Sequence, residues 1–504
     1  MIDIDKDLET LQEMRNAVQM AKEAQLAFSK FSQEQVDNVV KAIADAAYEK
    51  SYELARLAVE ETGLGVVEHK VIKNHVGSKE VYESIKDEKT VGVIYEDKQK
   101  KIVEVAAPFG VVAGIVPTTN PTSTAIYKTL IAVKAGNAIV FSPHPSAKKC
   151  TVEALKICRE AAEKAGAPAG LIGWITSPTM EATQQLMKHP DVNVILATGG
   201  GGLVRAAYSS GKPAYGVGPG NVPAYIERTA EVAKAVKRII ASKTFDNGTI
   251  CASEQALVVD QSIKEMVIRE FKNEGAYFLN DDEKEKMEKV ISPVAGKLNP
   301  KIVGKSARVI AQMANINVPD GTRLLIAFES NIAKSVPFSI EKLAPVFGFY
   351  TVSDWNEAMA VCDRLLALGG RGHSLALHTT DEEIARKFAL QMPVSRLLVN
   401  TPSALGAVGA TTGLKPSLTL GCGTFGGNIT SDNVTVTHLL NKKRMAYETK
   451  EIEIKSSAEP KSPATNQEDL LKEIVSEVVA KVGATGAADK ETIVRMVSKA
   501  ISHL

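Results

Sequence analysis

Cys251 lies in the segment TFDNGTICASEQA, residues 244–256, which is small and polar and has neither helical nor strand periodicity. A cysteine thiolate is a strong nucleophile and adds readily to an aldehyde carbonyl. Free cysteines are also often small buried hydrophobes. That is the role we expect for Cys150, Cys158 and Cys362, which lie in helix-like patterns. For Cys251 the local sequence leaves both interpretations open.

Four consecutive glycines lie in ILATGGGGLVRAA, residues 195–207, between a strand-like and a helix-like segment. Glycines let a ligand approach the backbone closely, and the N-terminus of the following helix attracts a phosphate. The run lacks the spacing of the G-x-G-x-x-G dinucleotide motif. It therefore indicates either a phosphate-binding loop or only a tight turn.

Asn120 lies in VPTTNPTSTA, residues 116–125, where a buried strand gives way to a helix. A side-chain amide at that place can donate a hydrogen bond to a developing oxyanion. Asparagine is also a common helix N-cap, and by itself the residue favours that interpretation. Other loop signals fall near strand ends, the usual place for a site in an α/β protein: GVGPGN (216–221), EKLAP (341–345), GGRGHS (369–374) and SALGAVGATTG (403–413).

Strands and helices that would position these residues alternate along the chain. Strand-like runs separated by amphipathic helices fill residues 123–229, and a similar pattern continues from about 240 to 425. This alternation predicts right-handed crossovers and parallel sheets, which is an α/β fold. Residues 6–62 have helical spacing, and residues 91–107 are typical of a β-hairpin.

Composition excludes several classes of function. The 504 residues include 60 basic and 59 acidic side chains, so no net charge attracts nucleic acid or an anionic membrane. No apolar run of about 18 residues predicts a membrane span, and from the charged first residues we expect no secretory signal. The five cysteines are scattered and form no C-x-x-C pair, so we expect reduced thiols, no structural metal and a cytoplasmic protein.

Taken together, the segments resemble the aldehyde dehydrogenase superfamily, and within it the CoA-acylating branch. The resemblance covers residues from about 8 to 447. It rests on motifs in the family's order: TTNPTSTAIYK, IVFSPHPSAKK, ILATGGGG, SSGKPAYGVGPGN, FDNGTICASEQ, EKLAPV and PSLTLGCGTFGGNITSDNV. It implies a Rossmann-like cofactor domain (1–236), an α/β catalytic domain (237–425) and a β oligomerisation flap made of the hairpin 91–107 and residues 426–447.

The resemblance also implies roles for single residues. Cys251 would be the nucleophile, and Asn120 with the Cys251 backbone N–H would stabilise the oxyanion. His373 would either assist the thiol of coenzyme A or be structural. The implied reaction converts a short-chain aldehyde, CoA and NAD(P)⁺ to acyl-CoA and NAD(P)H through a thioester on Cys251, in a homodimer or homotetramer. The implied cofactor contacts are Thr118, Pro143, His144, Thr198, Gly199, Gly200, Gly218 and Glu341.

Two departures from the superfamily pattern bear on specificity. Hydrolytic members carry a water-activating glutamate in an E-L-G-G-K motif, and the matching GVGPGN has no acid. Without that base the thioester can persist until CoA accepts the acyl group. The adenosine motif K-P-S-E is here Ser142-Pro143-His144-Pro145, and its missing acid leaves NAD and NADP both open.

The C-terminal part lies outside this resemblance. Residues 456–467 are a linker rich in Ser, Pro and Ala, and residues 468–504 contain two amphipathic helical stripes. They resemble encapsulation peptides, which dock enzymes to the shell of a bacterial microcompartment; self-association is the alternative. For the chain as a whole, a hydrolytic aldehyde dehydrogenase and an inactive scaffold stay open, and the aldehyde itself (acetaldehyde, propionaldehyde or sulfoacetaldehyde) is undetermined.

Overall fold

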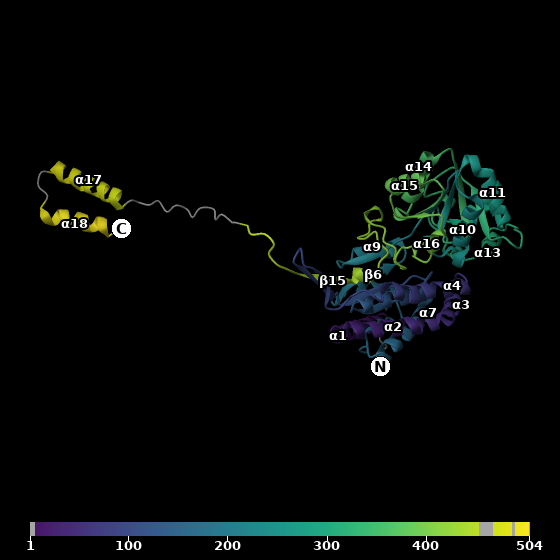
Figure 1. Ribbon diagram of the computed structural model, residues 1–504, viewed down its shortest axis with the longest axis horizontal. Coiled ribbons are helices and arrows are strands. Elements are labelled where there is room, and N and C mark those ends of the chain that lie inside the picture. The colour runs from purple at the N-terminus through teal and green to yellow at the C-terminus, as the bar shows by residue number, and fades with distance from the viewer. Residues whose placement is uncertain (1–5, 453–466, 486–488, 503–504) are drawn as a thin grey trace. The chain divides into compact units, whose positions relative to one another are not determined.

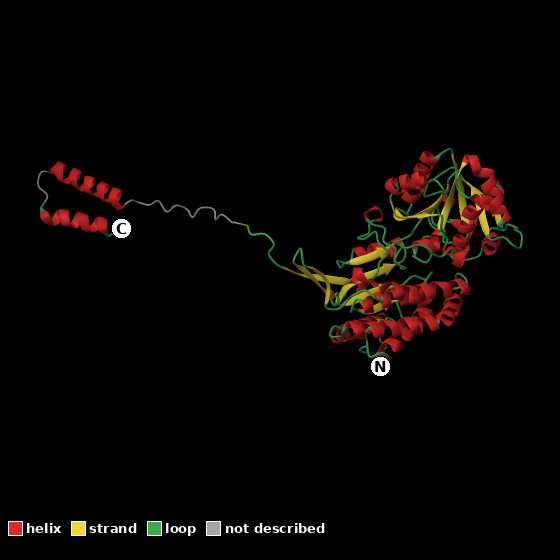
Figure 2. Ribbon diagram, in the orientation of Figure 1, coloured by secondary structure: helices red, strands yellow, loops and turns green. Residues whose placement is uncertain are grey.

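The computed structural model describes residues 6–452, 467–485 and 489–502. The chain divides into two compact units, Met1–Ala446 and Tyr447–Leu504. Figure 1 labels the elements, and Figure 2 distinguishes the strands from the helices around them. Three sheets, all in the first unit, are present in the described part of the chain. No described helix is long and apolar enough to cross a membrane.

The first parallel sheet has five strands in the order β5-β4-β3-β6-β7. Its central strands are short apolar runs buried on both faces, as expected where helices cover a parallel sheet. The chain proceeds outward from β3 to β5 and then returns to β6 on the other side of β3, so the strand order reverses between β3 and β6. The strands are β3 (Val111–Ile115), β4 (Ala138–Ser142), β5 (Ile172–Trp174), β6 (Val192–Thr198) and β7 (Ala214–Val217).

Two groups of helices pack against this sheet. One consists of α6 and α7, and the other of α1, α8 and α9. Every residue of α6 is buried, because α2, α3, α4 and α5 pack outside it. The helices are α1 (Lys6–Phe28), α2 (Gln33–Glu49), α3 (Ser51–Thr62), α4 (Val67–His75), α5 (Val81–Ile85), α6 (Pro121–Lys134), α7 (Lys148–Lys164), α8 (Met180–Lys188) and α9 (Gly201–Tyr208).

The second parallel sheet has seven strands in the order β10-β11-β12-β9-β8-β13-β14. Side chains of β9 alternate between two hydrophobic clusters: Leu257 and Val259 belong to one, and Ala256 and Val258 to the other. This period of two buries both faces of the strand. The strands are β8 (Val222–Ile226), β9 (Glu254–Asp260), β10 (Ala276–Phe278), β11 (Leu324–Phe328), β12 (Val346–Val352), β13 (Gly372–His378) and β14 (Val394–Val399).

Helices also flank the second sheet, with α10 and α11 packed together on its strands and α14 packed on β8 and β9. In Figure 1 these helices lie together at the opposite end of the first unit from α1 and α2. The predicted α/β class with parallel sheets is thus confirmed. The helices are α10 (Val232–Thr244), α11 (Lys264–Asn273), α12 (Asp281–Ile291), α13 (Ala307–Met313), α14 (Trp355–Ala367), α15 (Glu382–Gln391) and α16 (Ser403–Ala407).

The chain enters the second sheet before residue 236, which is where the sequence predicts the boundary between the cofactor domain and the catalytic domain. Strand β8 pairs with β9 and β13, so the second sheet begins at Val222. In the sequence β7 and β8 are separated only by residues 218–221 and look like neighbours in one sheet. The segment crosses instead from one sheet to the other, where the Asn221 amide donates to the carbonyl oxygens of Ser339 and Leu365 at 2.7 and 2.8 Å.

A third, antiparallel sheet consists of β1 (Val93–Asp97), β2 (Ile102–Pro108) and β15 (Leu440–Ala446). Strands β1 and β2 form the expected hairpin, and β15 pairs along the other edge of β2. Of the expected flap segment 426–447 only β15 is a strand. An oligomerising role for this sheet stays a prediction.

The second unit contains α17 (Gln467–Thr485) and α18 (Lys490–Ile501), which contact each other. Leu470, Ile474 and Val478 are half-buried, whereas Leu471 and Val475 one residue further along are exposed. Each turn of α17 therefore has one apolar residue that is half-buried and another that is exposed to solvent. The linker 456–467, apart from its last residue, lies outside the described residues.

Candidate active site

The reversal of strand order between β3 and β6 brings two of the predicted segments together. These strands are parallel neighbours, with Ile115 beside Ala197, so their carboxyl ends meet at one edge of the sheet. The chain leaves β3 into the TTNP segment and leaves β6 into the glycine run. In open α/β sheets ligands bind at such a point.

A cavity of about 390 Å³ opens at this edge. Other lining residues come from the start of α8, including Thr179, Met180 and Thr183, and none of the described lining residues is acidic. The cavity thus offers no carboxylate to a ribose 2′-hydroxyl. Six of the predicted cofactor residues line it: Thr118, Pro143, His144, Thr198, Gly199 and Gly200.

The glycine run fits a bound phosphate better than a mere turn. Gly200 is the N-cap of α9, and a Cβ placed on Gly200, Gly201 or Gly202 would meet no protein atom within 4 Å. Packing therefore does not demand glycine at these three positions. The absent side chains leave the backbone N–H groups at the helix N-terminus open to an anion. The residues present fit the pyrophosphate of a nicotinamide coenzyme.

Cys251 lies on a turn between α10 and β9 that the backbone makes sharp. Asp246, Asn247 and Gly248 have φ values of 51°, 52° and 77°, all in the left-handed region. Non-glycine residues rarely adopt this conformation, and such strain concentrates at functional sites. The turn places Cys251 half-buried beside the second sheet, while the other four cysteines are buried.

His373 is the closest polar partner of the cysteine. Its Nε2 lies 3.2 Å from the Cys251 Sγ, and its Nδ1 lies 3.0 Å from the Ser374 Oγ. Burial, together with the charge of Arg396, lowers the pKa of His373 to about 3, so the ring is neutral at physiological pH. A neutral imidazole at this distance can exchange a proton with the thiol. From the sequence we expect His373 either to assist the CoA thiol or to be structural, and neither role predicts this contact with Cys251.

Glu341 adds a carboxylate to the surroundings of the thiol. Burial raises the pKa of Cys251 to about 12, and the negative charge of Glu341 contributes to that shift. Burial raises the pKa of Glu341 itself to about 7. Its Oε1 accepts a hydrogen bond of 2.8 Å from the Gly220 N–H. The GVGPGN segment that lacks an acid in sequence is thus in contact with one in space.

Asn120 occupies the N-cap position of α6, but its side chain makes no capping hydrogen bond. The Oδ1 accepts a hydrogen bond of 2.6 Å from Lys73 Nζ, and the Nδ2 donates one of 3.1 Å to Thr119 Oγ1. An amide NH₂ has two donors. One of them is therefore available for a substrate oxygen.

Not all of the predicted cofactor residues line the β3–β6 cavity: Gly218 and Glu341 lie elsewhere. Gly218 lines another cavity, of about 450 Å³, with Cys422 and Phe425, and Glu341 lines neither cavity.

The sequence alone does not identify Lys70, Lys73 and Asp246, which form a buried charge cluster beside the turn that carries Cys251. Two lysines three apart on a helix look like a solvated face, so no sequence signal distinguishes them.

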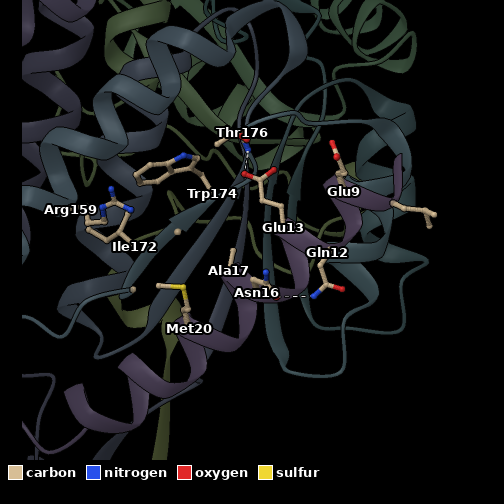
Figure 3. A pocket seen from close by; sticks show the side chains of 13 residues that line it. Glu9, Gln12, Glu13, Asn16, Ala17, Met20, Arg159, Ile172, Trp174 and Thr176 are labelled. Carbon is tan, nitrogen blue, oxygen red and sulfur yellow. Dashed lines mark hydrogen bonds between the residues drawn. The ribbon is translucent and has the colours of Figure 1, made fainter. Parts of the chain in front are cut away.

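A larger hollow of about 780 Å³ lies away from these residues, between α1 and the edge strand β5 (Figure 3). Arg159 stacks at 4.2 Å over the Trp174 ring, and the Glu13 carboxylate accepts from the Thr176 N–H at 2.9 Å. None of the predicted site residues lines it. The hollow is therefore not part of the candidate active site.

Comparison with known proteins agrees with this geometry. Residues 7–438 match the aldehyde dehydrogenase family. The chain belongs to that family. It is 48% identical over 439 residues to the bifunctional aldehyde-alcohol dehydrogenase AdhE of Escherichia coli K12, a match that covers 86% of this chain and 49% of the relative. The chain thus spans about half the length of the first curated relatives that it matches.

Two solved structures of aldehyde dehydrogenases match most of this chain, and the match covers nearly all of each of them. An acetylating aldehyde dehydrogenase from Geobacillus thermoglucosidasius is 57% identical, with a TM-score of 0.88 over 89% of this chain and 99% of the other. A propionaldehyde dehydrogenase from the fucose utilisation bacterial microcompartment of Clostridium phytofermentans is 30% identical, with a TM-score of 0.79 over 86% and 97% of the chains. The family resemblance inferred from the motifs is confirmed.

Proposed function

We propose that this aldehyde dehydrogenase converts a short-chain aldehyde, CoA and NAD(P)⁺ to acyl-CoA and NAD(P)H. The observation that carries the proposal is the meeting of a nucleophile on a strained turn with a neutral imidazole 3.2 Å away. Similarity to an acetylating enzyme supports CoA as the acyl acceptor. The GVGPGN departure supports it less strongly, because Glu341 bonds to that segment.

The mechanism follows from the residues around Cys251. His373 Nε2 takes the thiol proton as Sγ bonds to the aldehyde carbon, and the carbonyl oxygen becomes an oxyanion. The free donor of Asn120 and the Cys251 N–H bind that oxyanion. A nicotinamide coenzyme, when bound, supplies the acceptor for the hydride. Cys251 is then held as a thioester. CoA loses its thiol proton to solvent and attacks as the thiolate, which forms acyl-CoA, and the departing Cys251 sulfur takes back the proton that His373 holds.

The lining of the β3–β6 cavity supports use of either coenzyme. Thr118, Thr198, Gly199 and Gly200 would hold the pyrophosphate end, and Pro143 with His144 the adenosine end. With no acidic residue among the described lining, nothing there repels a 2′-phosphate.

A direct assay tests the proposed reaction. Coenzyme reduction is followed with acetaldehyde or propionaldehyde in the presence and absence of CoA, and the product is identified by mass spectrometry. We expect sustained turnover and acyl-CoA only with CoA, in line with the similarity to an acetylating enzyme, because the thioester on Cys251 then waits for a thiol acceptor. Turnover to the free acid at an equal rate without CoA would identify a hydrolytic enzyme. Inactivity of the folded protein under both conditions would support a scaffold.

For the second unit we propose docking to the shell of a bacterial microcompartment. Leu471, Val475 and Val479 form an exposed stripe on α17, and Val494 and Val497 are exposed on α18. Exposed apolar stripes of this kind mark interaction surfaces. One similar enzyme comes from a microcompartment. The family match ends at residue 438, so the stripe lies outside the part of the chain that matches the family.

Truncation tests this proposal. A chain ending at residue 459 should keep its kcat, because every proposed catalytic residue lies in the first unit. It should no longer sediment with a microcompartment shell protein, whereas the full chain does. Val475→Asp in the full chain is a finer probe and should weaken sedimentation as well. Equal sedimentation of all three proteins would contradict docking, and a change in oligomeric mass on truncation would favour self-association.

A further inference from the structure

Lys73 connects the two parts of the proposed catalytic machinery although it lies in neither. It comes from α4, is only 3% exposed, and uses all three of its ammonium protons. One goes to Asn120 Oδ1 at 2.6 Å and one to Thr249 Oγ1 at 2.9 Å. The third goes to the Asp246 carboxylate. Lys73 therefore bridges the amide at the start of α6 and the turn that carries Cys251.

Asp246 anchors this bridge at the turn. Its Oδ1 accepts from the Val66 N–H at 2.7 Å, and its Oδ2 accepts from Thr249 Oγ1 at 2.6 Å. The two neighbouring lysine charges hold the pKa of Asp246 well below its usual range, against the opposing effect of burial. A buried carboxylate that accepts hydrogen bonds from this many donors has little freedom to move. It holds Lys73 in place beside the turn that carries Cys251.

Lys70 provides an internal comparison. It lies on the same helix, is 2% exposed, and donates to the same Asp246 oxygen at 2.9 Å. Its other bond, of 3.0 Å, goes to the Thr119 carbonyl oxygen. Both lysines thus bury a charge against Asp246, but only Lys73 contacts the Asn120 side chain.

We propose that Lys73 is a positioning residue that orients the Asn120 amide for oxyanion binding, an inference that rests on the proposed function. An ammonium group can only donate, so the amide oxygen must face Lys73. The NH₂ group is then directed away from Lys73, with one proton on Thr119 and one free. A donor on the amide oxygen also polarises the amide and strengthens its N–H as a donor.

Two variants, Lys73→Met and Lys70→Met, test this role. Lys73→Met should lower kcat/KM for the aldehyde by about 30-fold, since a freely turning amide loses its alignment with the oxyanion. Lys70→Met removes the same kind of ion pair and should lower it by no more than about threefold. Thermal unfolding of both variants controls for stability. Equal losses of kcat/KM in the two variants would overturn the proposal.

Alkylation by iodoacetamide provides a second measurement, because that reaction occurs at Cys251 without forming an oxyanion. In Lys73→Met we expect the alkylation rate to stay within about threefold of wild type, as the role proposed acts through Asn120 and not through the thiol. A loss of alkylation parallel to the loss of kcat/KM would assign Lys73 to the turn and contradict the proposal. If Lys73→Met does not fold, Lys73→Arg serves instead: it keeps a donor and should retain kcat/KM within about tenfold.

A double-mutant cycle tests whether Lys73 acts through Asn120. In an Asn120→Ala background, Lys73→Met should change kcat/KM by less than about threefold, because the group it orients is gone. Independent, multiplying losses would show that Lys73 does not act through Asn120. The cycle needs only measurable aldehyde oxidation by the wild-type protein. If the wild type lacks that activity, the proposed function fails instead, so the two failures are distinct.

Discussion

Cys251→Ala will reduce aldehyde-dependent coenzyme reduction by a factor of about 10⁴ or more, because the reaction proceeds through a bond to its sulfur. The variant should fold normally, since Cys251 is half-buried and lies on a turn. Steady-state kinetics measures the loss. Mass spectrometry of wild type mixed with aldehyde and coenzyme, without CoA, should show one acyl adduct, and the variant should show none.

Cys362→Ala is the matched control for that experiment. Cys362 is a free, fully buried cysteine in α14, and burial raises its pKa far above the usual range, so it is an inert thiol. We expect its activity to stay within about twofold of wild type. Retention of the adduct in Cys251→Ala would move the nucleophile to another cysteine. Cys422, buried in the neighbouring cavity, would be the one to test next.

Asn120→Ala should lower kcat by about 10²–10³-fold, the usual cost of removing one oxyanion donor. The physical reason is that the free N–H of the amide has no substitute on the alanine side chain, and the backbone N–H of Cys251 alone stabilises the oxyanion less well. Coenzyme reduction at saturating aldehyde measures the effect. The affinity for coenzyme should change little, because Asn120 does not line the β3–β6 cavity.

Asn120→Asp distinguishes this role from helix capping. Aspartate is as good an N-cap as asparagine, but its carboxylate has no N–H to donate. If Asn120 binds the oxyanion, the aspartate variant should be at least as impaired as the alanine variant, because it also brings a negative charge to the oxyanion. Recovery of activity in Asn120→Asp would show that the residue matters to α6 and not to catalysis.

Much of the site could be predicted from the sequence because its motifs are local. Whether a residue ends a strand, begins a helix or lies in a glycine run depends on neighbours a few positions away. For that reason the TTNP segment and the glycine run were correctly placed at strand ends, and the parallel α/β class was anticipated. Position in the chain could not show that β3 and β6 are neighbours, although the family resemblance implies that Thr118 and Thr198 both contact the cofactor.

Other features depended on contacts between distant parts of the chain. The assignment of β8 to the second sheet required knowing its partners, since the four residues before it look like an ordinary turn. Glu341 meets Gly220 across 121 positions, and His373 meets Cys251 across 122. No local periodicity encodes such a pairing. Only the fold shows that a carboxylate and an imidazole surround the thiol.

The sequence by itself therefore determined the family, the fold class and the identity of the candidate nucleophile, because these reside in short segments with a fixed order. The tertiary structure decided the electrostatic setting. It buried Lys70 and Lys73 against Asp246, raised the pKa of Cys251 to about 12 by burial, and aligned Asn120 through Lys73. Burial and charge proximity are properties of the packed chain, and a helix carrying two lysines does not reveal in its sequence that it faces inward.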